Sequence, residues 1–131
     1  MSEIKRINPE KLAQPPGDRY AHVVQYGNLI WISGQTSRDT EGKVIGRGDT
    51  LAQARQVNKN LQTAIEAAGG DMDNIVKVTI FLTPEADIEA ARQAQNEYRA
   101  KFAAPASSMV IVQALANPEY LIEVEAFAVI N

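Results

Sequence analysis

The stretch that decides the fold of this chain is Leu121-Ile122-Glu123-Val124-Glu125-Ala126-Phe127-Ala128-Val129-Ile130. Its residue types alternate with a period of two, which predicts a β-strand with one apolar face and one mixed face. Glu123 and Glu125 share the mixed face with Phe127 and Val129. Side chains two apart on a strand lie roughly 7 Å from each other, so each carboxylate would raise the pKa of the other if both were poorly solvated. The pair indicates either a solvated outer face, which is the commoner arrangement, or the wall of a cleft.

Length and composition fit one globular domain that spans residues 1–131. Hydrophobic residues make up 45% of the chain and charged residues 22%. No segment has the roughly 20 apolar residues that cross a bilayer. The first residues are not followed by the apolar segment of a secretory signal. We therefore expect a cytoplasmic protein without a membrane anchor.

Charge and metal-binding residue types exclude several classes of function. The net charge is −3 and the basic residues are scattered, which does not favour nucleic acid as the main partner. Cysteine is absent and His22 is the one histidine, so neither thiolate nor paired-histidine metal sites can form within one subunit. We expect no metal site. A Ser-His-Asp triad would have to use His22, and a lone histidine on a strand is more often a packed or surface side chain.

Periodicity and breakers predict two helices. The first begins at Asp49 or Thr50, with Thr50 and Gln53 in capping-box spacing, and its apolar stripe ends at Gly69-Gly70. The second has Pro84 near its first turn and continues at helical spacing through Phe102.

The remaining segments are predicted as strands and turns. Residues 1–18 hold four breakers, which predicts an extended lead-in over the surface. Gly27-Asn28 is a two-residue hairpin signal, and the wholly apolar segment 29–32 after it should be a central strand buried on both faces. We predict strands at 19–26, 29–32, 75–82, 108–114 and 121–130, with at most a short edge strand at 43–45.

The order of these elements, ββ(β)αβαββ, predicts an α+β fold. Its mixed sheet should carry both helices on one face and leave the other face bare. Several strands have apolar residues on both faces, and a bare apolar face of this size is usually covered by another subunit. We therefore expect an oligomer with sites at the subunit boundaries.

Polar residues at strand ends and turns are the remaining candidates for chemistry. No dinucleotide-binding, phosphate-loop or nucleophile-elbow motif is present. Ser33 and Ser107 are interpreted as hydrogen-bonding groups or as satisfied turn residues, and the sequence does not decide between these. The candidates are Tyr20, Ser33, Gly34, Asn96, Ser107 and Glu123.

Seven ordered segments carry a resemblance across nearly the whole chain. They are Tyr20 ahead of the Gly-Asn turn, Ile32-Ser33-Gly34-Gln35, Ala52 to Leu61, Ala67-Ala68-Gly69, Val76 to Phe81, Asn96-Glu97-Tyr98 and Ile122 to Ala126. Together they resemble the reactive-intermediate deaminase family, also called the Rid or YjgF type.

The resemblance implies a chorismate-mutase-like fold assembled as a homotrimer, with the sheets forming a central barrel and small-molecule pockets between subunits. It implies hydrolysis of reactive enamines and imines, such as 2-aminoacrylate, to 2-oxo acids and ammonia without metal or cofactor. It also implies roles for individual residues. Glu123 would position or activate the attacking water. Tyr20, Ser33, Gly34 and Asn96 would line the pocket.

One position departs from the family pattern. Deaminating members read Pro-Ala-Arg-Ser after the second helix, and their arginine forks the substrate carboxylate, whereas this chain reads Pro105-Ala106-Ser107-Ser108. Ser107 offers one neutral donor instead. The turn through 116–119 also looks one residue longer. Arg19, beside Tyr20, is a candidate replacement cation, with a solvent-exposed position as the alternative.

The resemblance, together with Ser107 at the position of the family's arginine, leaves three possible functions. The first is a divergent enamine or imine deaminase, or a related hydrolase, in which ordinary 2-imino acid deamination is weakened by Ser107. The second is a non-catalytic ligand- or protein-binding module that uses the cleft between subunits. The third, ribonuclease or translation inhibitor, has no support from the net charge of −3 and a single histidine.

Overall fold

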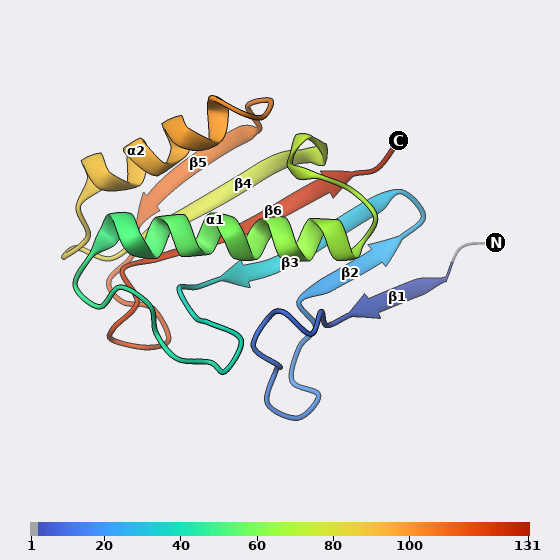
Figure 1. Ribbon diagram of the computed structural model, residues 1–131, viewed down its shortest axis with the longest axis horizontal. Helices are drawn as coiled ribbons and strands as arrows, with labels where there is room; N and C mark the ends of the chain where they lie inside the picture. Colours follow the sequence, from blue (N-terminus) through green and yellow to red (C-terminus); the bar gives the residue numbers. More distant parts are fainter. Residues whose placement is uncertain (1–2) are drawn as a thin grey trace.

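A computed structural model describes residues 3–131, and Figure 1 shows the helices lying across one face of a sheet. The elements are β1 (Ile4–Ile7), β2 (Val23–Tyr26), β3 (Leu29–Gln35), α1 (Thr50–Ala67), the 3₁₀ turn η1 (Met72–Asn74), β4 (Ile75–Leu82), α2 (Ile88–Arg99), β5 (Ala106–Ile111) and β6 (Ile122–Val129). Within these described residues, no helix combines the length and the apolar character needed to span a bilayer. The predicted α+β architecture with both helices on one face is confirmed.

The six strands form one mixed sheet in the order β1-β2-β3-β6-β4-β5. Only β4 and β5 pair in parallel, and α2 makes the crossover between them (Figure 1). All other pairs are antiparallel. Strand β6 thus lies between β3 and β4 and joins the two halves of the sheet.

The core lies between β6 with its neighbours and the inner stripe of α1. Alternate residues of β6 are buried against the helices: Ile122, Val124, Ala126 and Ala128. The helix contributes Val57, Leu61, Ala64 and Ile65, all of which are at most 1% exposed. The buried face of β6 therefore packs against the buried stripe of α1, as the two periodicities predict.

The first helix starts at the predicted residues, and the second does not. Asp49 caps α1, which begins at Thr50, by accepting the backbone N–H of Ala52; the predicted Thr50–Gln53 capping box does not form. Thr50 accepts the N–H of Asp87 instead. Asp87 in turn caps α2, which begins at Ile88, later than Pro84 suggested. The side chain of Asp87 accepts a backbone N–H of the first turn, which a proline side chain cannot do.

The N-terminal segment was only partly predicted. Residues 4–7 pair antiparallel with β2 as an edge strand, and Leu12 is 2% exposed in the core. Four residues with two charges carry no clear strand periodicity, and the strand forms because the edge of β2 offers unpaired backbone groups. Residues 1 and 2 lie outside the described part of the chain. The predicted strands 19–26 and 108–114 are also displaced, since β2 begins at Val23 and β5 covers Ala106–Ile111.

The face of the sheet opposite the helices is bare in the single chain. Segment 29–32 is central but is not buried on both faces, which corrects that prediction, because Leu29 is 42% and Trp31 37% exposed. Phe127, opposite Trp31 on β6, is 46% exposed. The apolar residues that the sequence assigned to a second buried face therefore lie on the surface.

Candidate functional site

Glu123 on β6 lies directly over Gly34 on β3. The pairing of these strands shifts between Ile32 and Gln35, and Gly34 lies within this irregularity. A β-carbon at position 34 would stand 2.7 Å from Cδ of Glu123 and would collide with its carboxylate. Glycine is thus required at position 34 for the Glu123 side chain to occupy its place.

The environment of Glu123 makes its carboxylate more basic. Burial raises the pKa of Glu123, and the neighbouring charge of Glu125 raises it further. Glu123 is half-buried whereas Glu125 is exposed. A carboxylate with a raised pKa holds and releases a proton closer to neutral pH, as general acid–base catalysis requires.

Ser33, beside Gly34, hydrogen-bonds to the segment that precedes β2, and Tyr20 lies at the start of this segment. The hydroxyl of Ser33 donates to the carbonyl of Ala21 (2.6 Å), and its backbone N–H donates to the carbonyl of His22 (2.9 Å). The ring of Tyr20 stands edge-on to His22 with centroids 5.6 Å apart. We call Tyr20, Ser33, Gly34 and Glu123 the Glu123 group; Gly34 lies against Glu123, and Tyr20 is linked to Ser33 through His22.

His22 is a packed structural residue in this group. It is 3% exposed, its Nε2 donates to the carbonyl of Ala13 (2.6 Å), and its Nδ1 accepts from Nε2 of Gln35 (3.1 Å). Burial lowers the pKa of His22. The hydrogen bond to Ala13 raises this pKa in part, and the positive charge of Arg38 lowers it further. Both ring nitrogens are occupied, which leaves none for a triad.

His22 should make the folded protein sensitive to mild acid. A lowered folded-state pKa means that its contribution to the free energy of unfolding is complete above the unfolded pKa of 6.5 and is lost as pH falls below it. The loss is at most about 1.4 kcal/mol per pH unit, because one proton is involved. Urea unfolding between pH 8 and 5.5 should show this slope, and His22→Gln should flatten it. Both proteins should carry Glu123→Gln, because the raised pKa of Glu123 changes the stability in the opposite direction with pH. If His22→Gln leaves the slope unchanged, His22 is not the group responsible.

Asn96 and Ser107 lie apart from this group in the single chain. Asn96 is exposed on α2, where its side chain accepts a hydrogen bond from Arg99. Ser107 is paired with Val78, whose side chain is buried on the helix-covered face, whereas Glu123 lies on the other face. The predicted site residues therefore fall into two groups that one chain does not bring together.

Arg19 stands alone among the predicted residues. It is exposed, and within residues 3–131 its side chain takes part in no hydrogen bond or ion pair. The geometry gives no particular reason for Arg19 to face a ligand.

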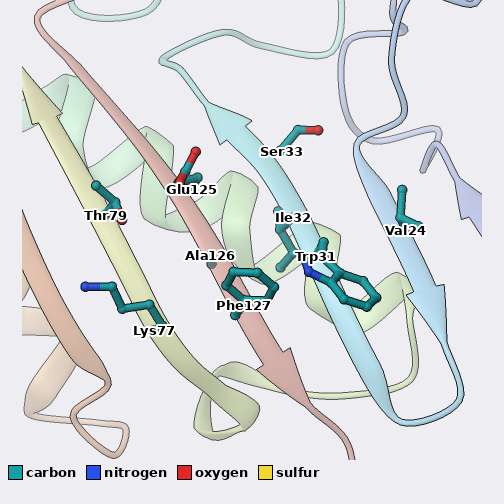
Figure 2. A pocket seen from close by; sticks show the side chains of 9 residues that line it. All are labelled: Val24, Trp31, Ile32, Ser33, Lys77, Thr79, Glu125, Ala126 and Phe127. Carbon is teal, nitrogen blue, oxygen red and sulfur yellow. The ribbon is translucent and has the colours of Figure 1, made fainter.

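The bare face is hollowed next to the Glu123 group. Figure 2 shows Trp31 and Phe127 beside each other, Lys77 and Thr79 on the neighbouring strand, and Ser33 and Glu125 towards one end. The hollow measures about 310 Å³, and the two aromatic rings meet edge-on at 5.7 Å. Lys77 donates from Nζ to Ser108 (2.7 Å). Nothing in the sequence marks Lys77, because its spacing is that of any outward residue on a strand.

The described part of the chain contains no cluster of side chains that could bind a metal ion. Among residues 3–131, no group of three or more His, Asp or Glu side chains is placed to hold a metal ion.

Comparison with known proteins agrees with this architecture. The sequence profile of the family described as Endoribonuclease L-PSP matches residues 11–130. The chain belongs to the L-PSP family. This is the Rid or YjgF type that the seven segments resemble, so the predicted membership is confirmed.

Individual L-PSP relatives are similar over almost their whole length. A RutC family protein of Pyrococcus abyssi is 34% identical over 93% of this chain and 94% of its own. A 2-iminobutanoate/2-iminopropanoate deaminase of Dermatophagoides farinae is 32% identical over 97% of this chain and 98% of its own. The crystal structure of the Escherichia coli YjgF gene product superposes with a TM-score of 0.87 at 34% identity, covering 95% of this chain and 98% of that one.

Proposed function

We propose that this protein hydrolyses small enamines or imines to oxo compounds and ammonia, with Glu123 as the general acid–base residue. The observation that carries the proposal is the half-buried Glu123 carboxylate, which lies over Gly34 with a raised pKa. Relatives named imine deaminases support the substrate class.

The reaction needs two proton transfers, and Glu123 can provide both; an enamine first tautomerises to the imine. Water adds its oxygen to the imine carbon while the carboxylate of Glu123 takes one water proton and passes it to the nitrogen, which gives a carbinolamine. Glu123 then takes the proton of the new hydroxyl and gives it to the nitrogen as the carbon–nitrogen bond breaks, so that the carbonyl compound and ammonia leave. No oxidant or reductant is consumed, and the carboxylate ends in its starting state.

We further propose that the working site forms between copies of the chain in a homotrimer. Tyr20, Ser33, Gly34 and Glu123 lie in one group, whereas Asn96 and Ser107 lie on the other side of the sheet. A neighbouring copy could supply the second group to the first. The exposed Trp31 and Phe127 on the bare face give such copies an apolar surface to bury.

A non-catalytic binding module is the second candidate, and Ser107 is the observation that favours it. The residue is exposed and neutral where deaminating members have an arginine. A site that lacks this fork could retain ligands without orienting them for attack.

The deciding experiment is a coupled assay on freshly generated 2-iminopropanoate, run with wild type and Ser107→Arg. We expect measurable wild-type turnover and a gain of about ten- to a hundredfold in kcat/KM for the variant, the value of a charged hydrogen bond. The exposed position can accept the longer side chain. Gln62→Arg, which adds the same side chain at an exposed position on α1, is the control and should give no gain. Binding of 2-oxobutanoate without turnover in either protein would favour the binding module.

A further inference from the structure

Gln53 on α1 is a wholly buried amide that binds three backbone groups from distant parts of the chain. It is 0% exposed. Its Nε2 donates to the carbonyl of Gly46 at 3.1 Å and to the carbonyl of Glu119 at 2.9 Å, and its Oε1 accepts the backbone N–H of Leu121 at 2.9 Å. Both N–H donors and the oxygen of the amide are therefore in use.

These bonds join two segments that continue from the strands of the Glu123 group. One segment follows β3, the strand that holds Gly34, and the other leads into β6, where Glu123 is the second residue. The ladder between β3 and β6 has its last pair at Gln35 and Val124. Gln53 joins the two segments beyond this point, where the strand pairing has ended.

The main chain just before β6 is held from two sides. The carbonyl of Leu121 accepts the backbone N–H of Thr83, directly after β4, at 3.0 Å, while its N–H donates to Gln53. The preceding turn is closed by the side chain of Asn117, which accepts the N–H of Glu119 at 2.8 Å. The entry of β6 thus has a fixed place between α1 and the sheet.

We propose that Gln53 is a positioning residue for Glu123: it fixes the entry of β6, so that the carboxylate lies over Gly34 and faces the reacting water. Its bonds hold the backbone two residues before Glu123, and a displaced carboxylate would lose the close contact with Gly34. A displacement of about 1 Å at a reacting group can cost about a hundredfold in rate. This inference rests on the proposed function for the reaction that Glu123 performs.

Gln53→Met keeps the length of the side chain and removes all three hydrogen bonds. For hydrolysis of 2-iminopropanoate, kcat should fall about ten- to a hundredfold while KM stays within about twofold, because the reacting group is misplaced and the substrate contacts persist.

Carbon-13 NMR of the Glu123 carboxyl, assigned with the help of Glu123→Gln, gives a second readout that needs no turnover. In wild type, burial raises the pKa of this carboxyl. In Gln53→Met the pKa should fall towards its ordinary value of 4.5, because a loosened strand end admits water to the carboxylate.

The matched control is Tyr98→Phe, which also removes a buried hydrogen bond from a side chain to the backbone. This bond runs from the Tyr98 hydroxyl to the carbonyl of Met72 (2.8 Å), between α2 and η1. The control should lower the thermal stability without changing kcat or the titration of Glu123. Gln53→Glu is a milder variant, because its carboxyl oxygen can still accept the N–H of Leu121, and both readouts should lie between those of wild type and Gln53→Met.

The inference is overturned if Gln53→Met leaves the titration of Glu123 unchanged, or if Tyr98→Phe changes it equally. Where Gln53→Met does not fold, Gln53→Glu decides by the same criterion. A titration that moves in the Gln53 variants while no protein, wild type included, hydrolyses imines would sink the proposed hydrolysis and leave the positioning role standing. Wild-type turnover with an unmoved titration would do the reverse.

Discussion

Glu123→Gln should lower kcat/KM for imine hydrolysis by about 10²- to 10⁴-fold, the usual contribution of a positioned general acid–base residue. Glutamine has nearly the same shape and can still lie over Gly34, so the loss would come from proton transfer and not from packing. Steady-state assays on freshly generated 2-iminopropanoate measure it. Circular dichroism and thermal unfolding of the variant should match those of wild type.

Glu125→Gln provides the control for this prediction. Glu125 is exposed and raises the pKa of Glu123 through its charge, so removing it should lower that pKa. The acid limb of the pH profile of kcat/KM should then move to lower pH, with the maximum rate largely kept. An equal loss of rate in both variants would mean that Glu123 has no special role.

Phe127→Asp should dissociate the assembly and reduce turnover to the detection limit. Phe127 is 46% exposed in the single chain, so the fold itself tolerates aspartate. At a subunit boundary, however, the substitution would bury an unpaired carboxylate against Trp31. Burying this charge costs several kcal/mol of association free energy per copy. Light scattering after size-exclusion chromatography should give the monomer mass for the variant and three times that mass for wild type.

The matched control is Gln62→Asp, which adds the same charge to an exposed position on α1. This variant should keep the mass and activity of wild type. A Phe127→Asp protein that stays assembled would place the interface elsewhere. A monomer with full activity would show that one chain holds the complete site.

Local periodicity was enough to predict the parts of the fold that depend on it. The alternation in β6 assigns each residue to its face, and the stripe of α1 needs no knowledge of its partners. Strand β1 could not be predicted in this way, because its four residues form a strand only against the edge of β2. The exposed side of segment 29–32 was misjudged since a sequence does not tell whether an apolar face meets a helix or another subunit.

The candidate site was predictable in its residue types and less so in its geometry. Glu123 lies against Gly34, which follows Ser33, whereas Asn96 and Ser107 belong to another part of the surface. The raised pKa of Glu123 depends on burial that only the packed sheet provides.

The position of β6 also has a consequence for how the chain folds during synthesis. β3 and β4 are not neighbours in the sheet, and both pair with β6, which the ribosome makes after every other strand. Until residues 122–129 emerge, the β1–β3 group and the β4–β5 group have no ladder between them, and each exposes unpaired edges. Contacts of long sequence separation form late, so the nascent chain needs protection from edge-to-edge association for most of its synthesis. The glutamate over Gly34 then takes its place in the same step that closes the sheet.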